Sequence, residues 1–331
     1  ESSRIGAADG TAVSVLEGMQ QYTSNKLVYA KGADVALGTP VFISETKINT
    51  TDKSGFEEAV NAAKQADVVV MVLGEHGLQS GEGRSRSEIG LPGVQQELLE
   101  TVYKANPNIV LVLANGRPLA ISWAAQYIPA IVESWHLGTQ SGNAIAQVLY
   151  GDYNPSGKLP MSFPRNVGQV PIYYNHKATG RPGGDTPTES VFWTHYTDVE
   201  NSPLYPFGHG LSYSKFEYSN LRLSSPSLSK NGKITVSVDI KNTSTTDGKE
   251  VAQLYLRDLF GSVTRPVKEL KGFELIEIEA GKTKTVNFEI NEKTIEFYTA
   301  NKKWEAEPGD FKVFVGGSSV TALEAGFTYS N

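Results

Sequence analysis

The sequence predicts an α/β sandwich with a mostly parallel sheet, followed by an all-β sandwich of immunoglobulin-like type. Its 331 residues are too many for one ordinary domain and suit two. In the first half, segments with helical spacing alternate with short, continuous apolar runs. From about Tyr218 the apolar residues instead recur at every second position, which is the period of a half-buried strand.

Two continuous apolar runs predict the central strands of the first domain. They cover residues 68–73, ended by Gly74, and residues 108–114, closed by Asn115-Gly116. Strands that are apolar on both faces and separated by helices are typical of a parallel sheet covered on both sides. The other predicted elements are helices at residues 12–21, 56–65, 94–104 and 142–150, and strands at residues 26–30 and 130–133.

The second domain is predicted from short strands with alternating apolar residues. They lie at residues 234–240, 251–256, 285–290 and 311–315, with turn signals such as Asn231-Gly232 between them. Short strands at this spacing favour an antiparallel sandwich. The proline-rich stretch before them fits neither pattern, and linkers of such length are usually functional or wrapped over a neighbour. We therefore predict domains at residues 1–165 and 218–331, joined by a linker at residues 166–217.

Composition excludes several classes of function. The net charge of −6 argues against a non-specific nucleic-acid binder, which normally has a basic surplus. No apolar run approaches the length of a membrane-spanning helix. The absence of cysteine removes disulfide scaffolds, thiolate zinc sites and cysteine nucleophiles. No glycine-rich phosphate loop follows a predicted strand, so we expect no nucleotide cofactor, and we expect no metal either.

The most polar part of the first domain follows its first predicted strand. In such a sheet, ligands collect outside the carboxyl ends of the strands. The loop at residues 75–90 carries Glu75, Glu82, Glu88, Arg84 and Arg86 among small residues. From the charges alone, a solvated surface loop is a better explanation of this segment than a functional site.

Other candidates are weaker. His76 and His136 lie near predicted strand ends without the carboxylate spacing of a metal site, so structural roles are favoured. Trp135 is either a platform for stacking a sugar or a core aromatic, and the core is favoured. The same choice, sugar contact or packing between domains, applies to the linker aromatics Tyr173, Tyr174, Trp193, Tyr196 and Tyr205.

Five segments together resemble a known family. They are residues 75–92 (EHGLQSGEGRSRSEIGLP), 110–118 (VLVLANGRP), 133–138 (ESWHLG), 151–164 (GDYNPSGKLPMSFP) and 204–213 (LYPFGHGLSY). In this order they resemble the C-terminal half of a family 3 glycoside hydrolase, of the bacterial periplasmic β-glucosidase type. The resemblance implies the second and third parts of a three-part enzyme: a (β/α)8 barrel, an α/β sandwich and a fibronectin type III-like sandwich.

The resemblance also implies a mechanism. Family members retain the anomeric configuration with two carboxylates, which stand about 5–5.5 Å apart in retaining enzymes. A barrel aspartate is the nucleophile, and a glutamate from the sandwich loop is the general acid/base. That glutamate maps onto Glu82, with Glu75 as the second choice. Arg84 and Arg86 are expected to face substrate hydroxyls or other acidic groups, and Arg86 and Trp135 are the candidate substrate contacts.

The barrel and its aspartate are missing from the 331 residues. We therefore expect this chain to be inactive by itself, and a barrel chain or domain to be its partner, with β-glucosides or oligosaccharides as substrates. Because Glu1 is not a methionine, either a leader was removed or the chain is the C-terminal part of something longer. The resemblance implies a periplasmic or secreted protein, and a homodimer is possible. The alternatives are a non-catalytic carbohydrate-binding or scaffolding fragment, and a β-xylosidase of the same family.

Overall fold

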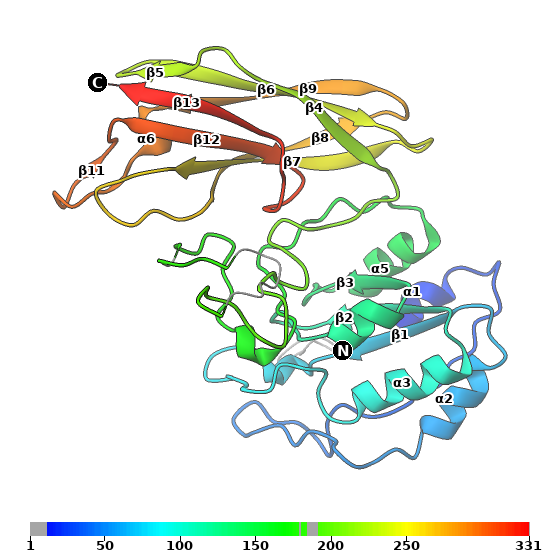
Figure 1. Cartoon of the computed structure of the whole chain (residues 1–331). Helices are drawn as coiled ribbons and strands as arrows, with labels where there is room; N and C mark the ends of the chain where they lie inside the picture. Colours follow the sequence, from blue (N-terminus) through cyan, green and yellow to red (C-terminus); the bar gives the residue numbers. More distant parts are fainter. Residues whose placement is uncertain (1–11, 179, 184–190, 331) are drawn as a thin grey trace. The chain divides into compact units, whose positions relative to one another are not determined.

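The computed structural model describes residues 12–178, 180–183 and 191–330, which form two compact units (Figure 1). The first unit takes in the chain up to Tyr153 together with Pro164–Val170. The second takes in Asn154–Phe163 and the chain from Pro171 onwards. The segment predicted as a linker is therefore divided, with its first residues in the first unit and the rest in the second.

The first unit is built on a three-stranded parallel sheet. Its strands β1 (Val69–Gly74), β2 (Ile109–Ala114) and β3 (Ala130–Glu133) lie in the order β1-β2-β3. Val69 pairs with Ile109, so the two continuous apolar runs lie side by side. Leu111, Val112 and Leu113 of the central strand are fully buried. The parallel sheet predicted from these runs is confirmed.

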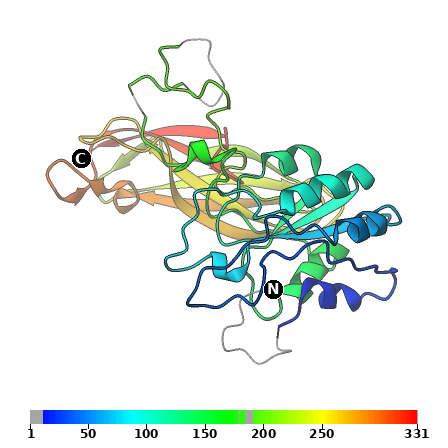
Figure 2. The ribbon, with the colours of Figure 1, turned by 90° about the horizontal axis from the view of Figure 1, so that it is seen from below.

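Helices cover both faces of this sheet. On one side α2 (Phe56–Ala63) packs against α3 (Gln95–Ala105), and on the other α1 (Val15–Gln20) packs against α5 (Ser141–Tyr150) (Figures 1 and 2). No helix in the described ranges is long and apolar enough to cross a bilayer.

One local prediction for the first unit was wrong, and one helix was missed. Residues 26–30 are irregular and do not form a strand, because no neighbouring strand offers them hydrogen-bonding partners; Val28 and Tyr29 are exposed. The helix α4 (Ser122–Tyr127) was missed because it has fewer than two turns of apolar periodicity. Tertiary contacts support it: Trp123 packs edge-on against Tyr103 of α3, with ring centroids 5.5 Å apart.

The second unit is a sandwich of two sheets, as predicted. The larger sheet has the order β5-β13-β12-β7-β8 and the smaller β4-β6-β9. Its strands are β4 (Phe216–Leu223), β5 (Ser227–Ser229), β6 (Lys233–Asn242), β7 (Gly248–Asp258), β8 (Glu269–Ile278), β9 (Thr283–Asn291), β12 (Gly309–Gly316) and β13 (Glu324–Ser330). A short helix α6 (Glu292–Ile295) and the hairpin of β10 (Phe297–Tyr298) and β11 (Trp304–Glu305) follow β9.

The core of this sandwich comes from the alternation visible in the sequence. Every second residue of β6 is buried, among them Ile234, Val236, Val238 and Ile240. They face buried residues of the other sheet such as Leu254. A period of two places one set of side chains on the inner face of a strand, which is why this pattern predicts a sandwich.

Candidate functional site

The end of β1 is fixed before the polar loop begins. Gly74 has a φ of +143°, and a Cβ there would lie 2.0 Å from the carbonyl oxygen of Ala114 on the next strand. The buried Gln95 side chain accepts the N–H of Gly74 and donates to its carbonyl, both at 2.8 Å. Glu75 then donates its own N–H to Ala114 at 2.8 Å. The chain therefore leaves the sheet in one defined direction.

Glu75 is the buried centre of the site. Its side chain has no exposed surface. Its carboxylate lies 2.7 Å from Nη1 of Arg86 and accepts hydrogen bonds from Ser80 Oγ and the Gly116 N–H, both at 3.1 Å. Nε of Arg117 lies 2.9 Å from the same carboxylate, but its N–H is not aligned on the oxygen, so this contact is an ion pair without a hydrogen bond.

These contacts determine the charge of Glu75. Burial by itself would raise the pKa of the carboxyl group. The hydrogen bonds from Arg86 and Gly116 and the charge of Arg117 outweigh burial, and the pKa lies below its ordinary value. Glu75 is therefore held as a carboxylate, which accepts hydrogen bonds and has no proton to donate at neutral pH.

Arg117 also fixes the shape of the loop. Its Nη2 donates to the backbone carbonyl of Gln79 and, at 3.0 Å, to that of Arg84. On the far side, Nη2 of Arg86 donates to the carbonyl of Gly90 at 3.0 Å. The Arg117 guanidinium thus holds the chain at Gln79 and Arg84, on both sides of Glu82.

Glu82 lies at the tip of the segment that Arg117 closes. Its side chain is exposed. Gly81 and Gly83 on either side have φ values of +121° and +69°, and no other atom lies within 4 Å of where their Cβ atoms would be. Among the described residues, no hydrogen bond or ion pair engages the Glu82 carboxylate. The loop therefore leaves the Glu82 carboxylate exposed at its tip.

The two arginines of the loop have different roles. Arg86 turns toward an acidic group, Glu75, as expected. Arg84 does not: its Nη2 donates to the backbone carbonyl of Phe42 at 2.5 Å. Its Cζ lies 5.7 Å from the centroid of the Phe42 ring. The expectation for Arg84 was wrong because its partner, Phe42, is distant in the sequence and no local pattern indicates the contact. Phe42 and its neighbour Ile43 are exposed, with 60% and 90% of their surface accessible.

The end of β3 adds a group that sequence reasoning missed. Glu133 accepts the N–H of Trp135 at 3.0 Å and a hydrogen bond from Nδ2 of Asn115 at 3.3 Å. Burial raises its pKa to about 7, against the lowering effect of these two hydrogen bonds. Trp135 is half-buried with a φ of +52°, so it is not a fully buried core residue. Asn115 also donates to the carbonyl of Arg117 at 2.8 Å, which links the β3 edge to the loop anchor.

The remaining candidates fall outside this arrangement. Nδ1 of His76 accepts the N–H of Leu78 at 3.1 Å and caps a short turn, which is a structural role. Tyr174 stacks on Phe207 with centroids 4.2 Å apart, and Tyr205 stacks on His209, so both pack within the second unit. Tyr173, Trp193 and Tyr196 are exposed. No group of three metal-ligating side chains gathers anywhere in residues 12–178, 180–183 and 191–330.

Comparisons with known proteins agree with this architecture. Residues 3–213 match the glycosyl hydrolase family 3 C-terminal domain, and residues 250–319 match the fibronectin type III-like domain. The chain is 45% identical over 326 residues to the periplasmic beta-glucosidase of Salmonella typhimurium, covering 96% of this chain and 42% of that protein. It is 41% identical over 309 residues to a beta-xylosidase of Formosa agariphila, covering 93% and 40% respectively.

A solved structure extends the likeness to three dimensions. The crystal structure of a beta-glucosidase from Listeria innocua matches with a TM-score of 0.85 and 38% identity, covering 97% of this chain and 42% of that one. The resemblance inferred from the five sequence segments is confirmed. The chain spans about two fifths of the length of the relatives it matches.

Proposed function

This chain belongs to glycoside hydrolase family 3, and from that premise we propose that it supplies the general acid/base of a retaining β-glucosidase. The observation that carries the proposal is the contrast between two glutamates of one loop. Glu75 is buried and held as a carboxylate, whereas Glu82 is exposed and unengaged at the tip. Of the two, Glu82 is the one that can approach a substrate.

Glu82 would act twice in the reaction. In the first step its carboxyl group donates a proton to the glycosidic oxygen while a nucleophilic carboxylate attacks the anomeric carbon. In the second step the Glu82 carboxylate takes a proton from water, which attacks the same carbon and releases the sugar. The nucleophile would come from a barrel domain or chain outside these residues, about 5–5.5 Å from Glu82. We therefore expect the 331 residues by themselves not to hydrolyse glycosides.

The anchors around Glu75 would position this acid. Because Arg86 and Arg117 are held by the buried Glu75 carboxylate, the loop ends lose little freedom when substrate arrives. Arg86 uses Nη1 and Nη2 inside the protein, and its remaining N–H donors and the exposed part of Trp135 are the proposed substrate contacts. The periplasmic relative supports a periplasmic or secreted location as part of the same proposal.

The second candidate is β-xylosidase activity. It is favoured by the Formosa agariphila relative, whose 41% identity is close to the 45% of the beta-glucosidase. A xyloside lacks the hydroxymethyl group of a glucoside, so the wall of the sugar pocket decides between them. That wall would belong largely to the missing barrel.

The test combines this chain with a family 3 barrel and measures hydrolysis of an aryl β-glucoside and an aryl β-xyloside. We expect no turnover with either part alone and turnover with the mixture, lost in Glu82→Gln. Glu88→Gln, at an exposed glutamate of the same loop, is the matched control and should keep activity. A mixture that turns over equally with Glu82→Gln would contradict the assignment. Sugar binding without any turnover in every mixture would favour a non-catalytic module.

A further inference from the structure

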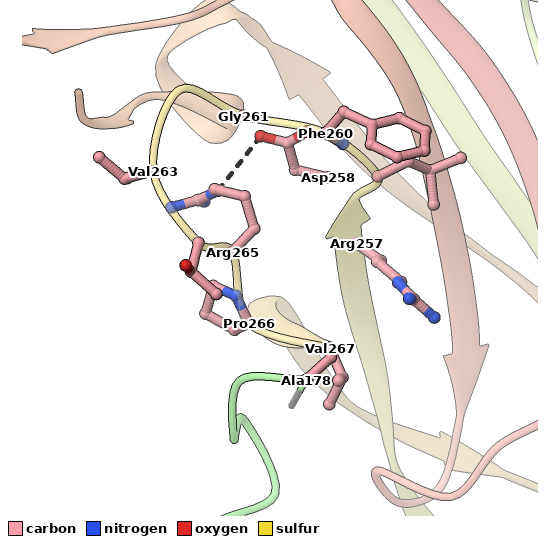
Figure 3. Close-up of a pocket in the computed structure, with 11 residues that line it drawn as sticks. Ala178, Arg257, Asp258, Phe260, Gly261, Val263, Arg265, Pro266 and Val267 are labelled. Atoms are coloured by element: carbon pink, nitrogen blue, oxygen red, sulfur yellow. Dashed lines mark hydrogen bonds and ion pairs between the residues drawn. The ribbon is translucent and has the colours of Figure 1, made fainter. Parts of the chain in front are cut away.

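Glu133 is a partly buried carboxyl group that faces no cation. It ends β3, at the carboxyl edge of the parallel sheet. Three other carboxylates in the described part of the chain are buried, and each pairs with a cation at 2.7 to 3.1 Å: Glu75 with Arg86, Glu250 with Lys158, and Asp258 with Arg265 (Figure 3). Among the same described residues, Glu133 forms no ion pair. Because a carboxylate without a cation is costly to bury, this exception needs a reason.

Two neutral donors take the place of a cation at Glu133. Its Oε1 accepts the backbone N–H of Trp135 at 3.0 Å, and its Oε2 accepts Nδ2 of Asn115 at 3.3 Å. Burial outweighs both hydrogen bonds and raises the pKa of the carboxyl group to about 7. A group that is neither paired nor fully solvated, at an edge where ligands collect, is more typical of a functional site than of a structural one.

The residue that Glu133 holds has a strained backbone. Trp135 has a φ of +52°, in the left-handed region that bulky side chains rarely adopt. Ser134, directly before it, is buried, and its N–H and Oγ both donate to the Leu113 carbonyl of β2, at 2.9 and 2.6 Å. The hydrogen bond from the Trp135 N–H to Glu133 then fixes the next peptide group. Strain that the surrounding contacts maintain in this way is concentrated at ligand sites.

Asn115 ties Glu133 to the loop of Glu82. The fully buried Asn115 side chain donates through Nδ2 both to Glu133 and, at 2.8 Å, to the carbonyl of Arg117. The Arg117 guanidinium in turn holds the carbonyl of Arg84 at 3.0 Å, on the C-terminal side of Glu82. A continuous set of hydrogen bonds therefore joins Glu133 to the loop that carries Glu82.

Among the described groups around this network, Glu133 is the one that titrates near neutral pH. Glu75 is held as a carboxylate, and Arg117 stays a cation. Burial lowers the pKa of His136, so its imidazole is neutral at pH 7. Because a carboxylate is a stronger acceptor than a neutral acid, loss of the Glu133 proton changes the strength of the bond that holds the Trp135 N–H.

We propose that Glu133 is a positioning residue of the sugar site: it holds Trp135 in the strained conformation in which the indole ring contacts substrate. The assignment rests on the proposed function, which makes Trp135 a substrate contact of the site that contains the acid Glu82. Glu133 itself does not touch the sugar and takes no part in the proton transfer. Its replacement should therefore weaken substrate binding through Trp135 and leave the chemical step largely unchanged.

The first test uses the chain by itself and needs no barrel. The fluorescence of Trp135 is obtained as the difference between the unaltered chain and Trp135→Phe. We expect this emission to change between pH 6 and 8, with a midpoint near the Glu133 pKa of about 7, and to be constant in Glu133→Gln. His136→Gln, next to Trp135, is the matched control and should keep the transition. A constant emission in the unaltered chain, or a transition that survives Glu133→Gln, would overturn the proposal.

The second test measures hydrolysis of an aryl β-glucoside with a family 3 barrel present. Glu133→Ala loses both acceptor oxygens and should raise KM about tenfold, with kcat changed less than about twofold. Glu133→Gln keeps an acceptor oxygen for the Trp135 N–H, so its KM should stay within about threefold of the unaltered value. Because Glu133 acts through Trp135, the KM of a Glu133→Ala Trp135→Ala chain should be no higher than that of Trp135→Ala. Additive losses, or a loss in kcat alone, would contradict the positioning role.

The controls separate this proposal from the previous one. A lack of turnover in every mixture would contradict the catalytic proposal, whereas the fluorescence transition of the chain needs no turnover and decides the link between Glu133 and Trp135. Glu97→Ala, at an exposed glutamate of α3 in the same unit, should leave KM and the transition unchanged. Thermal unfolding confirms that each variant is folded. Should Glu133→Ala not fold, the titration of Glu133→Gln still decides the proposal.

Discussion

The Arg117 guanidinium lies 2.9 Å from the buried Glu75 carboxylate, and the same guanidinium holds the carbonyl of Arg84 at 3.0 Å. The two residues come from loops that follow adjacent parallel strands, β1 and β2. A buried charge pair therefore sets the conformation of the exposed segment between Gln79 and Arg84. The pair explains how a glycine-rich loop can present Glu82 in a defined position.

Replacement of Arg117 is expected to destabilise the first unit. In Arg117→Met, Glu75 stays buried with only Arg86 as a charged partner, and removal of one member of a buried pair costs about 3–5 kcal/mol. We expect a loss at the lower end, about 3 kcal/mol, in urea unfolding at pH 7. The control Lys53→Met breaks the exposed pair with Glu97, where a loss of about 0–1 kcal/mol is expected. Equal losses in the two variants would contradict the structural role of Arg117.

The same variant should have a characteristic pH dependence. The folded-state pKa of Glu75 is lowered, so its ion pairs stabilise the fold above the unfolded-state pKa and are lost as pH falls through the folded-state value. In Arg117→Met the carboxyl group protonates more easily. The difference in unfolding free energy between the variant and the unaltered chain should therefore shrink as pH is lowered from 7 to 4. A difference that is constant with pH would show that Glu75 is not the group affected.

Glu133 should act in the opposite direction. Its folded-state pKa is raised from 4.5 to about 7, so the folded protein keeps a proton that the unfolded chain releases in this window. This contribution is present below pH 4.5 and is lost as pH rises through about 7, a change on the order of 3 kcal/mol. Glu133→Gln should therefore flatten the stability curve of the first unit between pH 5 and 8. Glu97→Gln on the exposed face of α3 should leave the curve as it is.

When a barrel is present, the effect of replacing Glu82 should depend on the leaving group of the substrate. General acid catalysis contributes about 10²–10⁴-fold, and it matters most when the leaving alcohol is a poor one. With a barrel present, the kcat/KM of Glu82→Gln, which reports the first step, should fall by about that factor on an alkyl β-glucoside and far less on a dinitrophenyl β-glucoside. Glu75→Gln alters the loop anchors instead, so it should slow both substrates alike. A uniform loss of kcat/KM in Glu82→Gln would contradict its role as the acid.

Gly74 should tolerate no side chain. A Cβ at this position would meet the Ala114 carbonyl at 2.0 Å, and its φ of +143° is unfavourable for other residues. Gly74→Ala should destabilise the first unit by more than the roughly 1–3 kcal/mol of backbone strain alone, because the clash adds to it. Gly138→Ala, where no atom lies within 4 Å, should be nearly neutral in the same unfolding measurement.

Much of the fold was predictable because its periodicities are local. The continuous apolar run of β2 and the strict alternation of β6 predicted a parallel sheet and a sandwich, since each pattern leaves one arrangement that buries the apolar groups. Local periodicity did not predict the short helix α4, and it wrongly predicted a strand at residues 26–30. Their conformations depend on partners that are distant in the sequence.

The sequence by itself determined the two-part architecture and the polar loop that carries the site. Only the tertiary structure decided which glutamate of that loop is buried, because Arg117 and Gly116 reach Glu75 from another strand end. It also brought Asn115 to Glu133, and Ser262 to the hairpin of Tyr298 and Trp304. The charge and exposure of a glutamate depend on which groups contact it in the folded protein. Glu75 and Glu82 lie in the same polar loop, and the local sequence does not show which of them Arg117 and Gly116 contact.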